Sequence, residues 1–172
     1  MSHSIVLTVV SDDRPGIVET LSEIIADHGG NWTESSMMSL AGKFAGILLV
    51  HMPEIQAPAF LEALDDLESD GMQIVAQRSD TPAIKDAASE YSFDLVGQDR
   101  PGIVHDITGV LTKHDVNVQE LETTVQSASM SGESLFMAHA RIFVPPDADL
   151  EALLNELEEL ANELMVDIEL EA

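Results

Sequence analysis

The sequence predicts an α+β fold in which one small domain of strands and helices occurs twice. The first observation is the hexapeptide DRPGIV, which occurs at 13–18 and again at 99–104, so that the offset is half of the 172-residue chain. The second is that a His, an Asn and the apolar positions of a helix follow both copies at the same spacing. A match that continues in the same apolar phase indicates a duplicated unit of about 80 residues.

Local periodicity predicts the first strand and helix of each copy. An apolar run at 5–10 and an alternating segment at 91–97 indicate strands. Pro15 and Pro101 suit the first turn of the helix that follows, where a main-chain N–H has no helical partner. The apolar stripes of these two helices are Ile17, Val18, Leu21, Ile24 and Ile25, and Ile103, Val104, Ile107, Val110 and Leu111.

The remainder of each copy predicts a second strand, a hairpin, a third strand, a second helix and a short last strand. The second strands are expected at 32–40 and 118–128, and Gly42 and Gly132 mark the hairpins. The apolar faces of the second helices are expected to hold Phe60, Leu64 and Leu67, and Leu150, Leu153, Leu154, Leu157 and Leu160.

The order in each copy is therefore β-α-β-β-α-β, which is the ferredoxin-like arrangement of a four-stranded antiparallel sheet with two helices on one face. We predict a first domain at 1–80 and a second at 91–172. A linker at 81–90 is expected to join them, because this segment is polar, contains Pro82 and has no apolar period.

The charge of the chain limits its partners. The 32 Asp and Glu against seven Lys and Arg give a formal net charge of −25. Such a surface repels the phosphates of nucleic acids and anionic membranes, so we expect neither as a direct partner. The absence of Cys, of a signal peptide and of an apolar run of about 20 residues predicts a soluble cytoplasmic protein.

The sequence contains no recognisable catalytic motif. The six His residues do not have the spacing of metal ligands, and neither a nucleophile elbow nor a phosphate-binding glycine loop occurs. We expect a protein that is not an enzyme and that has no cofactor or metal. His28 and His114 are expected at the C-termini of the first helices, where the helix dipole favours a cation.

The repeated turn has a chemical and a structural interpretation. Main-chain N–H groups at a helix N-terminus attract a carboxylate, and the glycine of the turn lets a ligand approach closely. Asp13 and Asp99 are suited to receive an ammonium group or to cap the helix, and Asn31 and Asn117 to reach the same place. The same turn also serves as a connection without a ligand, with Arg14 and Arg100 in ion pairs with nearby acids.

The element order, the DRPGIV turn and the Asn about fifteen residues later resemble the ACT domain. Two such units without an attached enzyme are similar to the glycine cleavage system transcriptional repressor family, and similar turns occur in the ACT unit of formyltetrahydrofolate deformylases. The resemblance implies that a ligand binds the first strand-to-helix turn, at an interface between paired units. The residues implied are Asp13, Arg14, Pro15, Gly16, Ile17 and Asn31, and Asp99, Arg100, Pro101, Gly102, Ile103 and Asn117.

The resemblance also implies a regulatory function. The chain is expected to bind a small amino acid, with glycine suggested by analogy, and to act on a DNA-binding transcriptional activator protein without contacting DNA. Exposed sheet edges also allow the two units of one chain to pair their sheets, or two chains to form a homodimer. Three alternatives stay open: a regulatory subunit of an amino-acid or folate metabolic enzyme, an enzyme, and an assembly module without a ligand.

Overall fold

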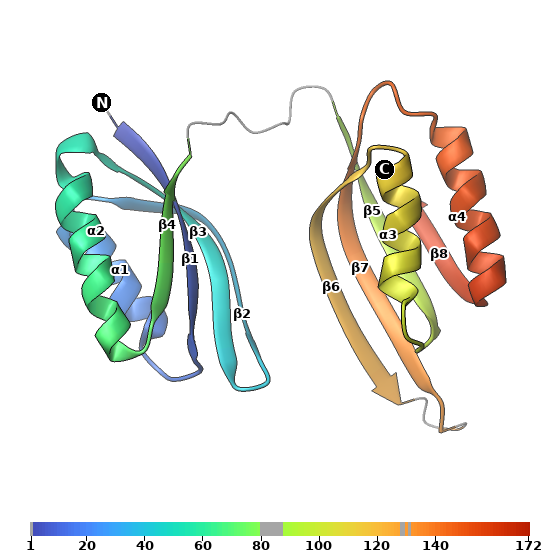
Figure 1. The fold of residues 1–172 in the computed structure, drawn as a ribbon, viewed down its shortest axis with the longest axis horizontal. Coiled ribbons are helices and arrows are strands. Elements are labelled where there is room, and N and C mark those ends of the chain that lie inside the picture. The colour runs from blue at the N-terminus through green and yellow to red at the C-terminus, as the bar shows by residue number, and fades with distance from the viewer. Residues whose placement is uncertain (1, 80–87, 128–129, 131) are drawn as a thin grey trace. The chain divides into compact units, whose positions relative to one another are not determined.

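The computed structural model describes residues 2–79, 88–127, 130 and 132–172. The chain divides into two compact units, Met1–Pro82 and Ala83–Ala172 (Figure 1). Most of the predicted linker, 81–90, lies outside the described residues, and the first strand of the second unit already begins at Ser89. No helix in the described part of the chain is long and apolar enough to cross a membrane.

Both units have the predicted element order. Unit 1 consists of β1 (Ser2–Asp12), α1 (Ile17–Asp27), β2 (Asn31–Leu40), β3 (Lys43–Pro53), α2 (Ala57–Asp66) and β4 (Gln73–Arg78), with short 3-10 turns at Glu54–Gln56 and Leu67–Asp70. Unit 2 consists of β5 (Ser89–Gln98), α3 (Ile103–Lys113), β6 (Asn117–Ser127), β7 (Ser134–Val144), α4 (Leu150–Leu164) and β8 (Val166–Glu171).

Each unit forms one antiparallel sheet whose helices cover one face (Figure 1). The strand orders are β2-β3-β1-β4 and β6-β7-β5-β8, so β2 and β6 lie at sheet edges. The predicted α+β fold of two ferredoxin-like domains is therefore confirmed.

The helix after each repeated turn begins later than the prolines predict. Gly16 (φ 94°) and Gly102 (φ 86°) adopt the left-handed conformation immediately before α1 and α3. A helix cannot extend back through a residue with positive φ, and glycine adopts this conformation with little strain. Pro15 and Pro101 therefore lie in the turn, and their predicted place in the first helical turn is wrong.

The two cores are mainly aliphatic and lie between sheet and helices. The predicted helix faces are largely correct, since Leu21 and Leu111 are each at most 2% exposed. Three residues of the predicted apolar faces are exposed, because each lies at the margin of its stripe and not at its centre. They are Val18 (47% exposed), Val104 (38%) and Leu154 (42%).

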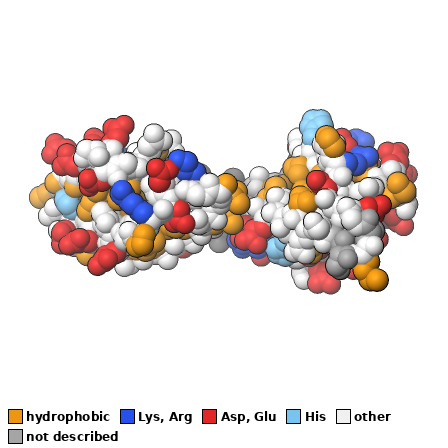
Figure 2. All heavy atoms as spheres, turned by 90° about the horizontal axis from the view of Figure 1, so that it is seen from below, with side chains coloured by type: hydrophobic (Ala, Val, Ile, Leu, Met, Phe, Trp, Pro, Cys, Tyr) orange, Lys and Arg blue, Asp and Glu red, His pale blue; other side chains and the backbone are white. Residues whose placement is uncertain are grey.

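The uncovered sheet faces of the two units differ in chemistry. That of unit 1 exposes apolar side chains, including Ile47 and Val75, which are 54% and 57% exposed. That of unit 2 carries ion pairs, among them His139 Nδ1 with Asp94 Oδ1 at 2.7 Å. Acidic side chains are spread over much of the surface seen in Figure 2, where Lys and Arg are few.

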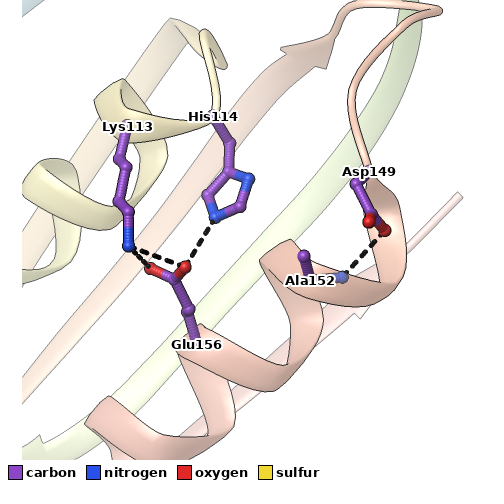
Figure 3. A network of polar contacts seen from close by, with 5 residues as sticks. All are labelled: Lys113, His114, Asp149, Ala152 and Glu156. Atoms are coloured by element: carbon purple, nitrogen blue, oxygen red, sulfur yellow. Dashed lines mark hydrogen bonds and ion pairs between the residues drawn. The ribbon is translucent and has the colours of Figure 1, made fainter.

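A polar network joins the two helices of unit 2 (Figure 3). Glu156 of α4 accepts two hydrogen bonds from Lys113 Nζ, at 2.8 and 2.9 Å, and its Oε1 lies 3.3 Å from His114 Nε2. The hydrogen bond from Lys113 lowers the pKa of the Glu156 carboxyl. Asp149 caps α4 by accepting from the Ala152 N–H at 3.0 Å.

The predicted positions of the two histidines are confirmed. His28 and His114 are the C-caps of α1 and α3. His28 Nδ1 donates a hydrogen bond to the Ile24 carbonyl at 2.8 Å. The His28 ring packs against that of Phe60 at a centroid distance of 5.8 Å. Both units thus have a His at this position, but His28 packs against an aromatic ring in unit 1 and His114 lies beside a carboxylate in unit 2.

The His139–Asp94 pair predicts a pH dependence of stability. The hydrogen bond and charge of Asp94 raise the folded pKa of His139. The stabilisation is therefore fully present below the unfolded pKa, about 6.5, and is lost as pH rises through the raised folded pKa. In thermal melts, His139→Gln should lower Tm at pH 6 and have a smaller effect at pH 9. Asp94→Asn should reproduce this pattern, and an equal loss at both pH values would contradict it.

Candidate functional site

The repeated turn of unit 1 is hydrogen-bonded to the hairpin between β2 and β3. The Asp13 N–H donates to the Gly42 carbonyl at 3.0 Å, and the Asp13 carboxylate accepts from Ser39 Oγ at 2.6 Å. Asp12 is hydrogen-bonded to Lys43, and this bond lowers the pKa of the Asp12 carboxyl. Both acids that precede the turn therefore already have partners within unit 1.

The turn of unit 2 keeps the main-chain contact and lacks the side-chain contacts. The Asp99 N–H donates to the Ser134 carbonyl at 2.8 Å, as Asp13 does to Gly42. Strand register places Val125 at the position that Ser39 has in unit 1. It places Gln98 and Leu135 at the positions of Asp12 and Lys43. Among the described residues, the Asp99 carboxylate has no hydrogen-bond or ion-pair partner. It remains available for a ligand cation.

The two arginines of the turns differ. Arg100 Nη2 lies 3.0 Å from Asp106 Oδ2, so the predicted ion pair with a nearby acid is correct there. The same prediction for Arg14 is wrong, because Arg14 Nη2 donates to the main-chain carbonyl of Asp70 at 2.6 Å. The 3-10 turn Leu67–Asp70 brings that carbonyl to the loop, and no local sequence pattern indicated it.

Both turns present uncapped helix N-termini. No side chain caps α1 or α3, so the expectation that Asp13 or Asp99 caps its helix is wrong. The first helical hydrogen bond of α3 runs from the Asp106 N–H to the Gly102 carbonyl, which leaves three earlier N–H groups without a helical acceptor. Such groups attract a carboxylate.

The first-turn acids at the two helix N-termini differ in their partners. Glu19 lies in the first turn of α1 and repels a carboxylate there. In α3 the corresponding residue is His105, and the acid of the first turn, Asp106, is paired with Arg100. The acid of the first helical turn is therefore paired with a cation in unit 2, whereas the structure gives no ion pair for Glu19 among the described residues of unit 1.

The structure separates the asparagines from the turns. Asn31 begins β2 opposite His51, whereas the turn follows Asp12, which lies opposite Lys43. Eight residues of β3 separate these positions, or about 26 Å. The expected convergence of Asn and turn is therefore wrong within one unit, and the register of Asn117 with Phe143 shows the same in unit 2. The eleven-residue helix carries the chain about 16 Å along the sheet before the second strand begins.

An apolar cleft of about 30 Å³ lies between α3 and β6 in unit 2. Val104, Ile107 and Leu111 line it from the helix, and Val118 and Leu121 from the edge strand. The sequence patterns assigned the helix residues to ordinary core packing and did not reveal a cleft. Comparison of the two repeats contains a partial signal, because unit 1 has the larger Trp32 and Leu48 where unit 2 has Val118 and Ala140.

Metal chemistry has no candidate residues in the part of the chain that the structure describes. No group of three or more His, Asp or Glu side chains there is arranged to hold a metal ion. The candidate site is therefore built from the helix N-terminus and the Asp99 carboxylate, and Val104 of the same helical turn also lines the apolar cleft.

The chain is similar to proteins of a known family over most of its length. Models of the ACT domain match residues 3–77 and residues 91–162. The glycine cleavage system transcriptional repressor of Escherichia coli is 25% identical over 166 residues, which cover 94% of this chain and 86% of that protein. A UPF0237 protein of Methanopyrus kandleri is 33% identical over 78 residues, 44% of this chain and 87% of that protein.

A solved structure extends this similarity to the fold. The crystal structure of an unknown protein from Galdieria sulphuraria is 32% identical and superposes with a TM-score of 0.84, covering 99% of this chain and 98% of that one. Both halves of the present chain match the same domain, and each folds into the same β-α-β-β-α-β unit. The chain therefore belongs to the ACT domain family, as a tandem of two ACT domains.

Proposed function

We propose that this chain is a non-enzymatic regulator that binds a small amino acid and changes its contact with a DNA-binding transcription factor. The observation that carries the proposal is the similarity to the E. coli glycine cleavage system transcriptional repressor over 94% of the chain. The net charge of −25 supports action through a protein partner, because the chain has few cations with which to neutralise DNA phosphates.

The ligand site is proposed at the turn of unit 2. An amino-acid carboxylate binds the first N–H groups of α3, and the ammonium group binds the unpartnered Asp99 carboxylate. Arg100 neutralises Asp106 and so lowers the repulsion of the bound carboxylate. Glycine is a candidate ligand by analogy with the repressor.

Asn117 reaches this site from a second copy of the chain. The edge strand β6 begins at Asn117 and ends at Ser127, near the hairpin that contacts the turn. If two β6 strands pair antiparallel, the start of one strand lies beside the end of the other. Each Asn117 then approaches the turn of the other copy, which compensates for the distance of about 26 Å within one unit.

Ligand binding regulates the partner only if it favours one arrangement of the paired units. An amino acid held between two copies stabilises their association by its difference in affinity for the paired and unpaired states. A transcription factor that binds one of these states is then released or retained as the amino-acid concentration changes. The proposed mechanism requires no chemical step.

The first test removes the proposed ammonium partner. Asp99→Asn should weaken amino-acid binding about 10- to 100-fold, the usual effect of losing a charged hydrogen bond, in titration calorimetry with glycine and other amino acids. Asp167→Asn removes the same charge from β8 and should leave binding unchanged. Equal affinity of Asp99→Asn and the wild type would contradict the site assignment.

The second test asks whether one site contains residues of two copies. Asp99→Asn and Asn117→Ala should each lose tight binding, and mixing the two proteins should restore it. In a two-fold dimer each mixed pair has one site with both residues intact, so about a quarter of the wild-type sites should return. Failure of the mixture to recover any tight binding would contradict the shared site.

The third test concerns the regulatory target. Deleting the gene should raise transcripts of glycine-degrading enzymes, and the tagged chain should retain a DNA-binding transcription factor in an amino-acid-dependent manner. The purified chain alone should not shift the mobility of the promoter DNA. Unchanged transcripts, together with retention of an amino-acid or folate enzyme instead, would overturn the proposal in favour of an enzyme's regulatory subunit.

A further inference from the structure

The cleft between α3 and β6 is apolar, and Val104, in the first turn of α3, forms one end of its wall. Its volume is about 30 Å³, and Ile107 (5% exposed) lies in its wall. Val104 and Leu121, which are 38% and 45% exposed, also line it. The hydroxyl of Thr108, which belongs to the same lining, donates to the Val104 carbonyl at 2.8 Å. The lining therefore offers an entering group no charge and no free hydrogen-bond donor.

Two residues that line the cleft are smaller than their counterparts in unit 1, although Leu121 is larger than its counterpart Ser35. Strand register places Val118 where unit 1 has Trp32, and Ala140 where it has Leu48. In unit 1, Trp32 packs against the core and Leu48 is 2% exposed. Two large side chains of unit 1 are thus replaced by smaller ones along the same wall.

A further difference concerns the residues beside this wall. Unit 1 has Met37 opposite Gly46, and its Cγ lies 2.4 Å from the position that a Cβ on Gly46 would take. Met37 therefore occupies the space above that glycine. Unit 2 has Thr123 and Ala138 at these positions. Unfilled apolar space forfeits packing contacts, so this cleft lowers stability unless another molecule fills it.

The size and position of the cleft define what fits. A water-sized group needs about 10 to 15 Å³ by this measure, so the cleft holds about two or three non-hydrogen atoms. An isopropyl group has that size and needs no polar partner. Val104 is also the second residue of α3, among the N–H groups that precede the first helical hydrogen bond. A molecule whose carboxylate binds that turn therefore lies next to the part of the cleft that Val104 lines.

We propose that unit 2 selects an amino acid with a branched aliphatic side chain of about the size of valine, which enters the α3–β6 cleft. This inference rests on the proposed function, since the turn of unit 2 holds the ligand's carboxylate and ammonium groups. Glycine leaves the cleft empty, and threonine places a hydroxyl against carbon atoms.

The full chain should be titrated with L-valine, L-threonine and glycine by calorimetry. Valine should bind about 10-fold or more tightly than glycine, because each methylene in an apolar pocket contributes about that much, and it should also exceed threonine. If glycine or threonine binds as tightly as valine, this inference is wrong while the proposed function stands. If no amino acid binds, both are wrong.

Two variants that install the unit 1 residues test the location. Ala140→Leu fills the cleft, and Leu121→Ser, which introduces the counterpart of Ser35, removes apolar surface at an exposed position. Both should reduce valine affinity toward that of glycine and leave glycine affinity unchanged. Val96→Thr, at a 38% exposed position on the other sheet face, is the matched control and should retain the preference for valine.

A thermal melt of each variant establishes that it is folded before titration. Because Leu121 is 45% exposed, Leu121→Ser should fold even if Ala140→Leu does not, and it then decides the outcome alone. An undiminished preference for valine in folded Leu121→Ser would overturn the assignment to the cleft.

Discussion

The site depends on one backbone constraint, the left-handed glycine between the first strand and the first helix of each unit. Gly16 and Gly102 adopt φ values of 94° and 86°, which side-chain-bearing residues rarely adopt. The helix therefore begins directly after the glycine, without a side-chain cap. Its first N–H groups therefore have no helical acceptor, and groups of this kind attract anions.

The sheet topology prevents the turn and the asparagine of one unit from meeting at the same place. The helix that follows the turn carries the chain to the opposite end of the sheet, so the asparagine that begins the next strand is far from the turn. Because that strand lies at the sheet edge, its unpaired main-chain groups are available to another strand. In the homodimer that we propose, pairing of edge strands brings turn and asparagine together and so couples ligand binding to association.

The two repeats keep one backbone and differ in the side chains around it. In unit 1, Ser39 and Lys43 engage the acids of the turn, and Trp32 and Leu48 fill the space beside the helix. In unit 2, Asp99 has no partner among the described residues, and the space beside the helix remains open. Duplication followed by such changes lets one unit be specialised for stability and the other for a ligand.

The sequence by itself determined the duplication, the element order and the buried helix faces, because each follows from spacing between neighbouring residues. Tertiary structure alone decided the partner of Arg14, the position of Asn117 and the α3–β6 cleft. Arg14 meets a carbonyl at Asp70, Asn117 is positioned by its register with β7, and the cleft depends on side chains from four elements. These features are contacts between residues far apart in the chain, which local periodicity does not encode.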